Sequence, residues 1–426
     1  IFLIDDINHN KLTFREIEIE SSKIASNLID LGLRQGDKVG IIMENSASLV
    51  KLYFACLFCG IVVIPINHNM SSQEIEHIIN HSKMKFVFVD TTTNSKINNN
   101  FLNSKKISKL LIKKSDKSII ESNLIVLNFD KISLIGNFKP FQNISSNDDM
   151  IIIYTSGTTA KPKAVIHKIS DIVKNALVFG KELEIGKDNR FYNILSLSYL
   201  GGYYNLLLLP FVLGSSVVLT NTFNPKSALN FWESIIKHNV NTLWLVPSIM
   251  SILMEIDRSA DGENYCKNNI KKILTGTAPL SIQLRKEFEK KYDVKVFENY
   301  GLSETFFIST NSQKHPVKDG SVGKILEGVK IKIVDKYGKE VEEGNEGEVI
   351  VKTIFLMKGY YNLGNNNKLK KFFTHDWFKT GDIGILKKST LYITGRKKDM
   401  IIRGGVNISP VSIENIFYKH PKAIEC

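Results

Sequence analysis

The chain has 426 residues, of which 43% are hydrophobic and 23% charged. This balance is ordinary for a globular protein and excludes a collagen-like, coiled-coil or largely disordered chain. Lys plus Arg number 56 and Asp plus Glu number 43, which gives a net charge of +13. Because the excess is mostly lysine scattered among asparagine and isoleucine, without an arginine-rich stripe, we do not expect a nucleic-acid partner.

Two further classes are excluded by the apolar and cysteine patterns. The longest apolar run, 53–66, has 14 residues and contains Gly60 and Pro65, so it is shorter than the roughly 18 residues that span a bilayer. With neither a transmembrane segment nor a signal peptide, we expect a cytoplasmic protein. Cys56 and Cys59 form a CxxC, but no second pair or nearby histidine completes a zinc site, so we expect two buried helix cysteines.

The first part of the chain alternates helical spacing with short apolar runs, and this alternation predicts a parallel α/β sheet. The predicted helices are 13–31, 48–60 and 71–80, and the predicted strands are 39–43, 61–65 and 86–89.

The remainder of the chain changes character twice. Residues 91–149 are rich in Ser, Asn and Lys and are predicted to be partly loop, with weak strands around Leu110 and Ile125. Buried strands return at 243–246 and 272–275. After Gly320, Gly-rich turns predict an antiparallel sheet or small barrel, with strands at 330–334, 348–352, 383–387 and 391–394.

The densest chemical signal is the segment 151–167, IIIYTSGTTAKPKAVIH. An apolar strand leads into five small residues that allow backbone N–H groups to approach phosphate oxygens, and Lys161 and Lys163 add positive charge. The segment lacks the GxxxxGK[ST] pattern of a Walker A loop. A polar turn seldom needs so many small residues followed by spaced lysines, so we interpret the segment as a phosphate-binding loop.

Four more segments follow in order: GTAP at 276–279, NYGLSET at 299–305, TGD at 380–382 and GRKKDMIIRGGVNISP at 395–410. Together with the phosphate loop they resemble the adenylate-forming superfamily, which includes acyl-CoA synthetases, peptide-synthetase adenylation domains and luciferases. The resemblance covers nearly the whole chain. It implies an α/β fold, with a large multi-subdomain domain of parallel sheets and a small antiparallel β subdomain over 1–397. Residues 398–426 would then be the hinge and the start of a small C-terminal domain.

The resemblance also implies roles for individual residues. Glu304 is the expected Mg²⁺ ligand, since Mg²⁺ prefers oxygen ligands and bridges phosphates, and Thr158, Lys163 and Glu304 form the expected catalytic set. Asp382 would accept the ribose hydroxyls, Tyr300 would face adenine, and Lys398 would mark the hinge. The expected ATP-binding set is Thr155, Ser156, Gly157, Thr158, Thr159, Lys163, Gly276, Thr277, Ala278, Glu298, Asn299, Tyr300, Gly301, Thr305, Asp382 and Arg396.

The sequence departs from the family pattern in three places. Ala160 and Ala164 replace glycines of the phosphate loop, and Tyr199 stands where many relatives carry histidine. Relatives also continue past Cys426 for roughly a hundred residues, typical of a small domain, and carry a late lysine that is not in this sequence. Either the chain is a fragment, which the missing initiator Met at Ile1 favours, or the protein lacks its lid.

The region 191–220 contains no Asp, Glu, Lys, Arg or His and consists of apolar, aromatic and small polar residues. Relatives form the acyl pocket here, and those that activate amino acids place an Asp to pair with the α-ammonium. A buried ammonium without such a partner is costly, so we expect a fatty or aryl acid. The expected pocket residues are Tyr199, Gly202, Val246 and Pro247.

The resemblance therefore implies an ATP-dependent acyl-CoA synthetase, an acid–thiol ligase of fatty acid metabolism. It would form acyl-AMP from a carboxylic acid and MgATP, and then a thioester with coenzyme A or with the phosphopantetheine of an acyl carrier protein. Two alternatives stay open: a nucleotide-binding protein without a lid and without full ligase activity, and an amino-acid adenylation domain.

Overall fold

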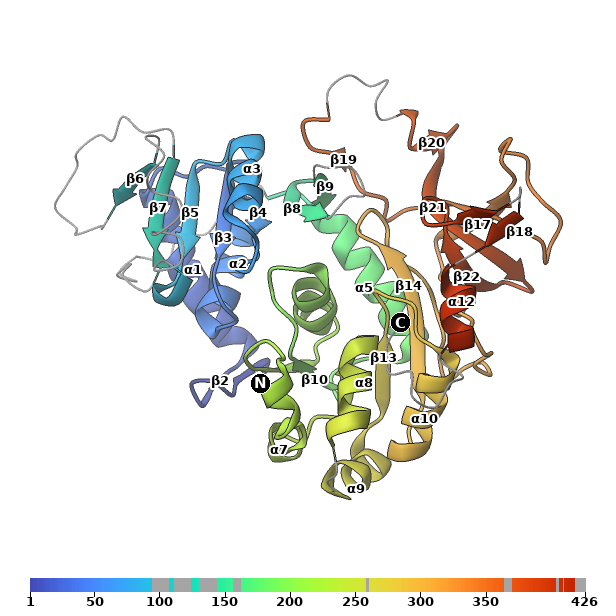
Figure 1. The fold of residues 1–426 in the computed structure, drawn as a ribbon. Helices are drawn as coiled ribbons and strands as arrows, with labels where there is room; N and C mark the ends of the chain where they lie inside the picture. The colour runs from blue at the N-terminus through green and yellow to red at the C-terminus, as the bar shows by residue number, and fades with distance from the viewer. Residues whose placement is uncertain are drawn as a thin grey trace.

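The computed structural model has three groups of strands, coloured in chain order from blue to red in Figure 1. The residues it describes are 1–93, 107–110, 124–129, 144–155, 162–257, 260–363, 370–403, 406–408 and 410–417.

The N-terminal sheet is mostly parallel, as the alternating pattern predicts. Among the described residues its strand order is β19-β9-β8-β4-β3-β5-β7-β6. The bounds are β3 Lys38–Ile42, β4 Val62–Pro65, β5 Phe86–Val89, β6 Ile107–Leu110, β7 Leu124–Asn128, β8 Asp149–Thr155, β9 Lys163–Lys168 and β19 Gly359–Tyr360. β9 runs antiparallel to both β8 and β19, so a segment far along the chain closes this edge of the sheet.

The helices of this region follow from capping and apolar periodicity. They are α1 Phe14–Asp30, α2 Ala47–Phe58, α3 Ser72–Ser82 and α5 Ile169–Leu183. The Thr13 and Ser71 hydroxyls accept from the backbone N–H of Glu16 and Glu74, whose carboxylates accept in return, so both helices begin with a capping box. All three predicted helices are confirmed within two residues. The weak strands predicted near Leu110 and Ile125 are confirmed as β6 and β7.

A second parallel sheet occupies the middle of the chain, with the order β14-β13-β12-β10-β11-β1. Its strands are β1 Leu3–Asp5, β10 Arg190–Asn193, β11 Ser216–Leu219, β12 Thr242–Trp244, β13 Lys272–Thr275 and β14 Val296–Leu302, and β2 Asn10–Leu12 pairs antiparallel with β1. The helical segments are η2 Gly201–Leu208, α6 Leu209–Val212, η3 Pro225–Ala228, α7 Phe231–Lys237, α8 Pro247–Ile256, α9 Ala260–Asn269 and α10 Ile282–Tyr292. The strand predicted over 243–246 ends early, because Val246 begins the turn into α8 and Pro247 is the first residue of that helix.

The antiparallel region continues from β14 in the order β15-β16-β22-β21-β18-β17. Its strands are β15 Phe306–Thr310, β16 Lys324–Ile325, β17 Val329–Val334, β18 Glu346–Thr353, β20 Phe373–Thr374, β21 Trp377–Lys387 and β22 Thr390–Arg396, and the hairpin β23 Ile401–Arg403 with β24 Val406–Ile408 precedes α12 Pro410–Phe417. The antiparallel prediction after Gly320 is therefore confirmed. In Figure 1 this region, in orange and red, lies on the opposite side of α5 from the blue sheet.

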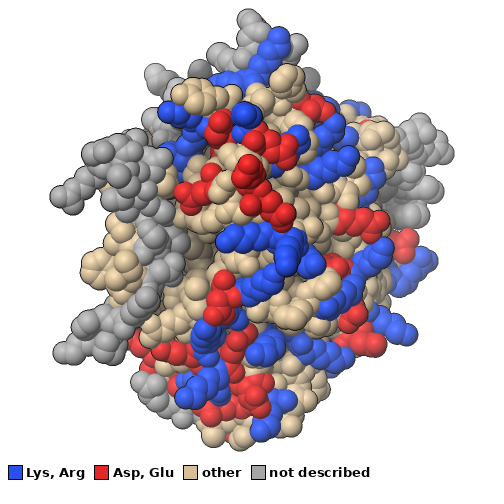
Figure 2. Space-filling view, turned by 90° about the vertical axis from the view of Figure 1, so that its right-hand side faces the viewer, with Lys and Arg blue, Asp and Glu red and all other residues tan. Residues whose placement is uncertain are grey.

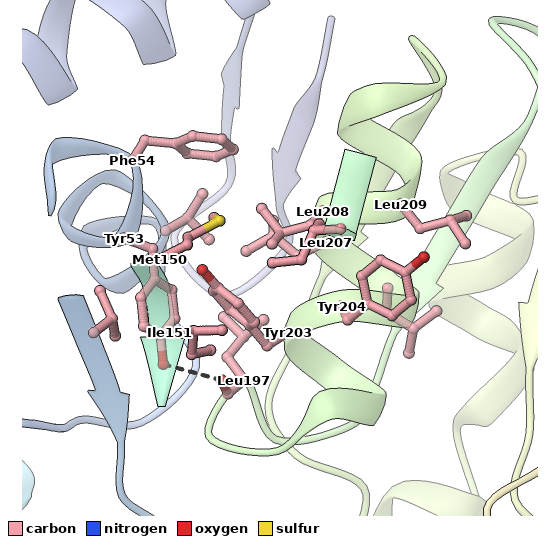
Figure 3. Packing of buried hydrophobic residues seen from close by; sticks show 14 of the residues in the cluster. Tyr53, Phe54, Met150, Ile151, Leu197, Tyr203, Tyr204, Leu207, Leu208 and Leu209 are labelled. Atoms are coloured by element: carbon pink, nitrogen blue, oxygen red, sulfur yellow. Dashed lines mark hydrogen bonds between the residues drawn. The ribbon is translucent and has the colours of Figure 1, made fainter. Parts of the chain in front are cut away.

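The main hydrophobic core joins the sheets through α2, α5 and η2. η2 is a π-helix, and the residues from Gly202 to Leu208 are buried. In Figure 3 the Tyr203 ring faces Tyr53 of α2, with the ring centroids 4.6 Å apart, and the Tyr53 hydroxyl donates to the Leu197 carbonyl at 3.0 Å. A side chain at Gly202 would clash, since a Cβ there would lie 2.2 Å from the Ser196 carbonyl oxygen. The core thus fixes η2 beside the carboxyl ends of the middle strands.

Candidate functional site

The candidate site lies at the carboxyl ends of β13 and β14, the edge where open α/β sheets bind ligands. Thr275, the last residue of β13, is in register with Glu298 of β14. Gly276 follows Thr275 and lies so close to the next strand that a Cβ would be 2.5 Å from the Asn299 side-chain oxygen. Thr277 then has φ +75°, a left-handed conformation that is uncommon for a residue with a side chain. The turn exposes Thr277 and Ala278 at this edge.

Three predicted site residues form one hydrogen-bonded network, although they lie far apart in the sequence. The Tyr300 hydroxyl donates to one oxygen of Asp382 at 2.5 Å, and Arg396 Nε lies 3.0 Å from the other. Asp382 is 3% exposed, and it is in register with Arg396 across the β21–β22 pair. Burial raises the pKa of Asp382, although Tyr300 and Arg396 oppose the shift. Burial and the Asp382 carboxylate both raise the pKa of the Tyr300 hydroxyl, which therefore stays a donor.

The connection between β14 and β15 carries Glu304 and Thr305. A register shift at Tyr300 and Gly301 interrupts the ladder, and Phe306 has φ +55°, so the backbone is strained on both sides of the connection. The Thr305 hydroxyl donates to the Phe306 carbonyl at 3.0 Å and accepts from the Leu302 N–H at 3.3 Å. These bonds hold the connection in a compact turn.

Two residues outside the predicted set hold this connection in place. The His167 ring nitrogen Nε2 lies 2.6 Å from the Ser303 carbonyl oxygen, which makes it the donor, and the His167 ring lies 4.0 Å from that of Phe306. The Tyr360 hydroxyl donates to Oε1 of Glu304 at 2.6 Å. Sequence reasoning assigned no role to either residue. His167 ends the segment read as a phosphate loop, but nothing in the sequence links Tyr360 to Glu304.

The phosphate-loop segment is only partly described. Thr155 ends β8 and is paired with Lys163 at the start of β9. Ser156, Gly157, Thr158, Thr159 and Lys161 lie outside the described residues, as do Gly404 and Gly405 of the hinge motif. Lys163 Nζ lies 4.5 Å from the centre of the Phe372 ring and 5.4 Å from that of Tyr360. Burial lowers the pKa of Lys163, and the nearby Glu304 carboxylate opposes this shift.

The predicted acyl-pocket residues separate into exposed and buried sets. Tyr199 is 49% exposed, whereas Gly202 is buried in η2. Val246 and Pro247 are half-buried at the start of α8. Tyr204 is part of the packed core. Its hydroxyl donates to Oδ1 of Asn175 at 2.7 Å, and its ring centre lies 4.6 Å from that of Phe306. The uncharged stretch is therefore mainly core, with Tyr199 at its margin.

The residues present fit a bound MgATP. Asp382 lies next to Tyr300, and each of its carboxylate oxygens keeps a lone pair beyond the one in use. Among the described residues only Tyr360 hydrogen-bonds the Glu304 carboxylate, at Oε1, and Mg²⁺ is commonly held by one or two carboxylates together with substrate phosphates. In the described part of the chain, no group of three or more His, Cys, Asp or Glu side chains is placed to hold a metal by itself.

The remaining predictions concern cysteines, charge and membranes. Cys56 in α2 and Cys59 at its end are buried, which confirms the structural interpretation. Burial raises the pKa of the Cys59 thiol to about 12 and also raises the pKa of the Cys56 thiol well above its usual value, so both thiols stay protonated. On the face shown in Figure 2, Lys and Arg lie interspersed with Asp and Glu. None of the described helices is long and apolar enough to cross a membrane.

Comparison with known proteins identifies a family and a fold. The family described as AMP-binding enzyme matches residues 1–361. The chain is 28% identical over 417 residues to the 2-succinylbenzoate–CoA ligase of Bacillus subtilis, covering 97% of this chain and 79% of the relative. It is 25% identical over 423 residues to the long-chain-fatty-acid–CoA ligase FadD13 of Mycobacterium tuberculosis, covering 97% and 79%.

A solved structure supports the same comparison. O-succinylbenzoate coenzyme A synthetase from Bacillus subtilis, in complex with ATP and magnesium ion, matches with a TM-score of 0.82 and 27% identity over 99% of this chain and 82% of that chain. The predicted α/β fold, with a large parallel portion and a smaller antiparallel sheet, is confirmed by this likeness.

Proposed function

This chain belongs to the AMP-binding enzyme family, and from that premise we propose how its residues carry out the family's reaction. The resemblance inferred from the sequence motifs is confirmed, as is the class of enzyme, an ATP-dependent acid–thiol ligase that acts through acyl-AMP. The assignments of roles to residues below are proposals.

The observation that carries the proposal is the meeting of two polar groups of residues at one sheet edge. Asp382, held by Tyr300 and Arg396, would accept hydrogen bonds from the ribose hydroxyls. Glu304, held by Tyr360, would bind Mg²⁺ on the phosphates, and Lys163 would neutralise the β- and γ-phosphates. The first group lies on β14, β21 and β22 of one sheet, and the second joins the β14–β15 connection to β9 and β19 of the N-terminal sheet, so the nucleotide would bridge the two sheets.

The reaction then needs positioning and charge stabilisation. A carboxylate oxygen attacks the α-phosphorus, the bond to the bridging oxygen breaks, and pyrophosphate leaves with the electron pair. Mg²⁺ supplies charge neutralisation on the phosphate oxygens. Lys163 and the Thr158 loop would hold the leaving pyrophosphate, and a Thr305 hydroxyl turned from the Phe306 carbonyl would donate to the α-phosphate. A thiolate then attacks the acyl carbon, which releases AMP and forms the thioester.

We propose a fatty or aryl acid as substrate and either coenzyme A or a carrier-protein pantetheine as the thiol. The support is the uncharged 191–220 region, which offers no partner for an α-ammonium. The domain boundary between residues 397 and 398, with Lys398 as hinge, is part of the same proposal.

Pyrophosphate exchange into ATP tests the substrate proposal on the full-length protein. Short and long fatty acids, benzoate-type acids and the standard amino acids are supplied one at a time with MgATP. We expect exchange with a fatty or aryl acid and background exchange with every amino acid. Exchange that is fastest with an amino acid would contradict the pocket argument while leaving the family assignment intact.

A further inference from the structure

Tyr360 is held rigidly beside the phosphate-loop hairpin. Its short strand β19 pairs with β9, with Gly359 opposite Ile166 and Tyr360 opposite Val165. Backbone bonds on both sides reinforce this pairing, since the Lys358 N–H donates to the Ile166 carbonyl at 2.9 Å and the Tyr361 N–H to the Ala164 carbonyl at 2.7 Å. The Tyr360 side chain is buried. Its phenol therefore has little freedom to move.

The segment that ends in Tyr360 holds Glu304 at two points. The Met357 N–H donates to the Glu304 carbonyl at 2.8 Å, and the Tyr360 hydroxyl donates to the carboxylate oxygen Oε1 at 2.6 Å. The Tyr360 phenol therefore occupies Oε1, and within the described part of the chain no hydrogen bond or ion pair engages Oε2.

The ring of Tyr360 faces a cation. Lys163 Nζ lies 5.4 Å from the Tyr360 ring centre and 4.5 Å from that of Phe372, and the two ring centres are 4.9 Å apart. Aromatic faces attract an ammonium by roughly 0.5 to 2 kcal/mol, depending on how far it is desolvated. Tyr360 thus contacts both the Glu304 carboxylate and the Lys163 ammonium, which lie close enough to influence each other.

We propose that Tyr360 is a positioning residue of the metal and phosphate site, an inference that rests on the proposed role of Glu304. Its hydroxyl occupies Oε1 of the Glu304 carboxylate, so that Oε2 would be the oxygen left to bind the metal. Its ring, with that of Phe372, holds Lys163 on aromatic faces instead of in a tight ion pair with Glu304. Incoming phosphates then recruit Lys163 without first breaking that pair.

The variant Tyr360→Phe removes only the hydroxyl, and Tyr361→Phe is the matched control on the next residue. The Tyr361 ring lies against His81 at 5.8 Å and under Lys38 at 5.4 Å, away from Glu304. Binding of Mn²⁺ as a probe for Mg²⁺ is measured from its free EPR signal in the presence of α,β-methylene ATP. Because a hydrogen bond to a charged group is removed, we expect Tyr360→Phe to weaken Mn²⁺ binding about tenfold. Metal-free AMP binding should stay within about twofold for both variants.

A double-variant cycle separates this inference from the proposed function. If Tyr360 acts through the carboxylate, Tyr360→Phe should change Mn²⁺ affinity less than about twofold in a Glu304→Gln background. A full tenfold effect in that background, or an unchanged affinity in the single Tyr360→Phe variant, would overturn the inference. If Glu304→Gln itself leaves Mn²⁺ affinity unchanged, the proposed metal role of Glu304 fails instead.

Discussion

The β14–β15 connection and the π-helix η2 meet at Phe306 and Tyr204, whose ring centres lie 4.6 Å apart, but they are built differently. The connection is held by polar contacts from distant segments, including those of His167 and Tyr360. η2 is held by close packing of buried rings and aliphatic side chains, as Figure 3 shows. We therefore expect single polar atoms to determine ligand affinity at the β14–β15 connection. In η2, the volume of the buried side chains should determine stability.

The largest effect is expected at Asp382. Asp382→Asn keeps the shape but replaces one acceptor oxygen by a donor, and charge-assisted bonds to the ribose are lost. We expect AMP affinity to fall about 100-fold, measured by calorimetry, since hydrogen bonds to charged groups contribute roughly 1.5 to 3 kcal/mol. The melting temperature should fall as well, because the amide N–H₂ group then faces one of the two donors, Tyr300 or Arg396.

Asp376→Asn is the matched control for Asp382→Asn. Asp376 is an exposed carboxylate near the start of β21, paired with Lys352. The Asp376→Asn variant should bind AMP like the unmodified protein. If Asp382→Asn also binds AMP normally, the polar region does not hold the nucleotide.

The next largest effect tests the packed region. Gly202→Ala places a Cβ 2.2 Å from the Ser196 carbonyl oxygen inside η2, so the backbone must shift. Overpacking of this kind costs about 3 kcal/mol of unfolding free energy, measured by urea denaturation. Gly186→Ala is the control, because a Cβ at Gly186 meets no atom within 4 Å. Equal stability of the two variants would show that η2 tolerates added volume.

Lys163→Ala should lower ATP affinity roughly 10- to 30-fold by removing one charge-assisted phosphate contact. AMP affinity should change much less, because AMP lacks the β- and γ-phosphates. Competition of both nucleotides against a fluorescent ATP analogue measures the difference. Lys174→Ala on the exposed face of α5 is the control. A parallel loss of ATP and AMP affinity would place Lys163 elsewhere than at the terminal phosphates.

The smallest effect concerns pH. Burial raises the pKa of Glu298 to about 7, although Arg285 opposes the shift. The folded state therefore keeps a proton that the unfolded state loses near pH 4.5, and stability should fall as pH rises from about 4.5 to 7. Glu298→Gln should remove this part of the slope and raise stability at pH 8. Urea denaturation at several pH values measures the unfolding free energy of both proteins. If its dependence on pH is the same in Glu298→Gln, Glu298 does not have a raised pKa in the folded protein.

The sequence predicts the order of the elements well because helix caps and apolar periodicity are local properties. The capping boxes at Thr13 and Ser71 and the strand at 86–89 are found where their patterns lie. The five ordered motifs also lead to the family, although Tyr300, Asp382 and Arg396 lie within strands β14, β21 and β22 and not on turns.

Other features depend on contacts between distant segments and leave no local pattern. The link from Tyr360 to Glu304 spans 56 residues, and β19 joins β9 from almost 200 residues away. The π-helical form of η2 depends on packing against Tyr53 and Phe306, which propensity does not report. The burial of Tyr203 and Tyr204 follows from the same packing, so an uncharged stretch alone does not separate a pocket wall from core.

The central claim is that the carboxylate of the substrate attacks the α-phosphorus of ATP at this sheet edge. Isotope transfer tests it directly on the full-length protein, with an ¹⁸O-labelled fatty or aryl carboxylic acid that supports pyrophosphate exchange, MgATP and a thiol acceptor. The predicted result is one ¹⁸O atom in the AMP released during thioester formation, detected by mass spectrometry, with unlabelled pyrophosphate. Label in inorganic phosphate together with ADP, or AMP without label, would contradict the acyl-AMP route.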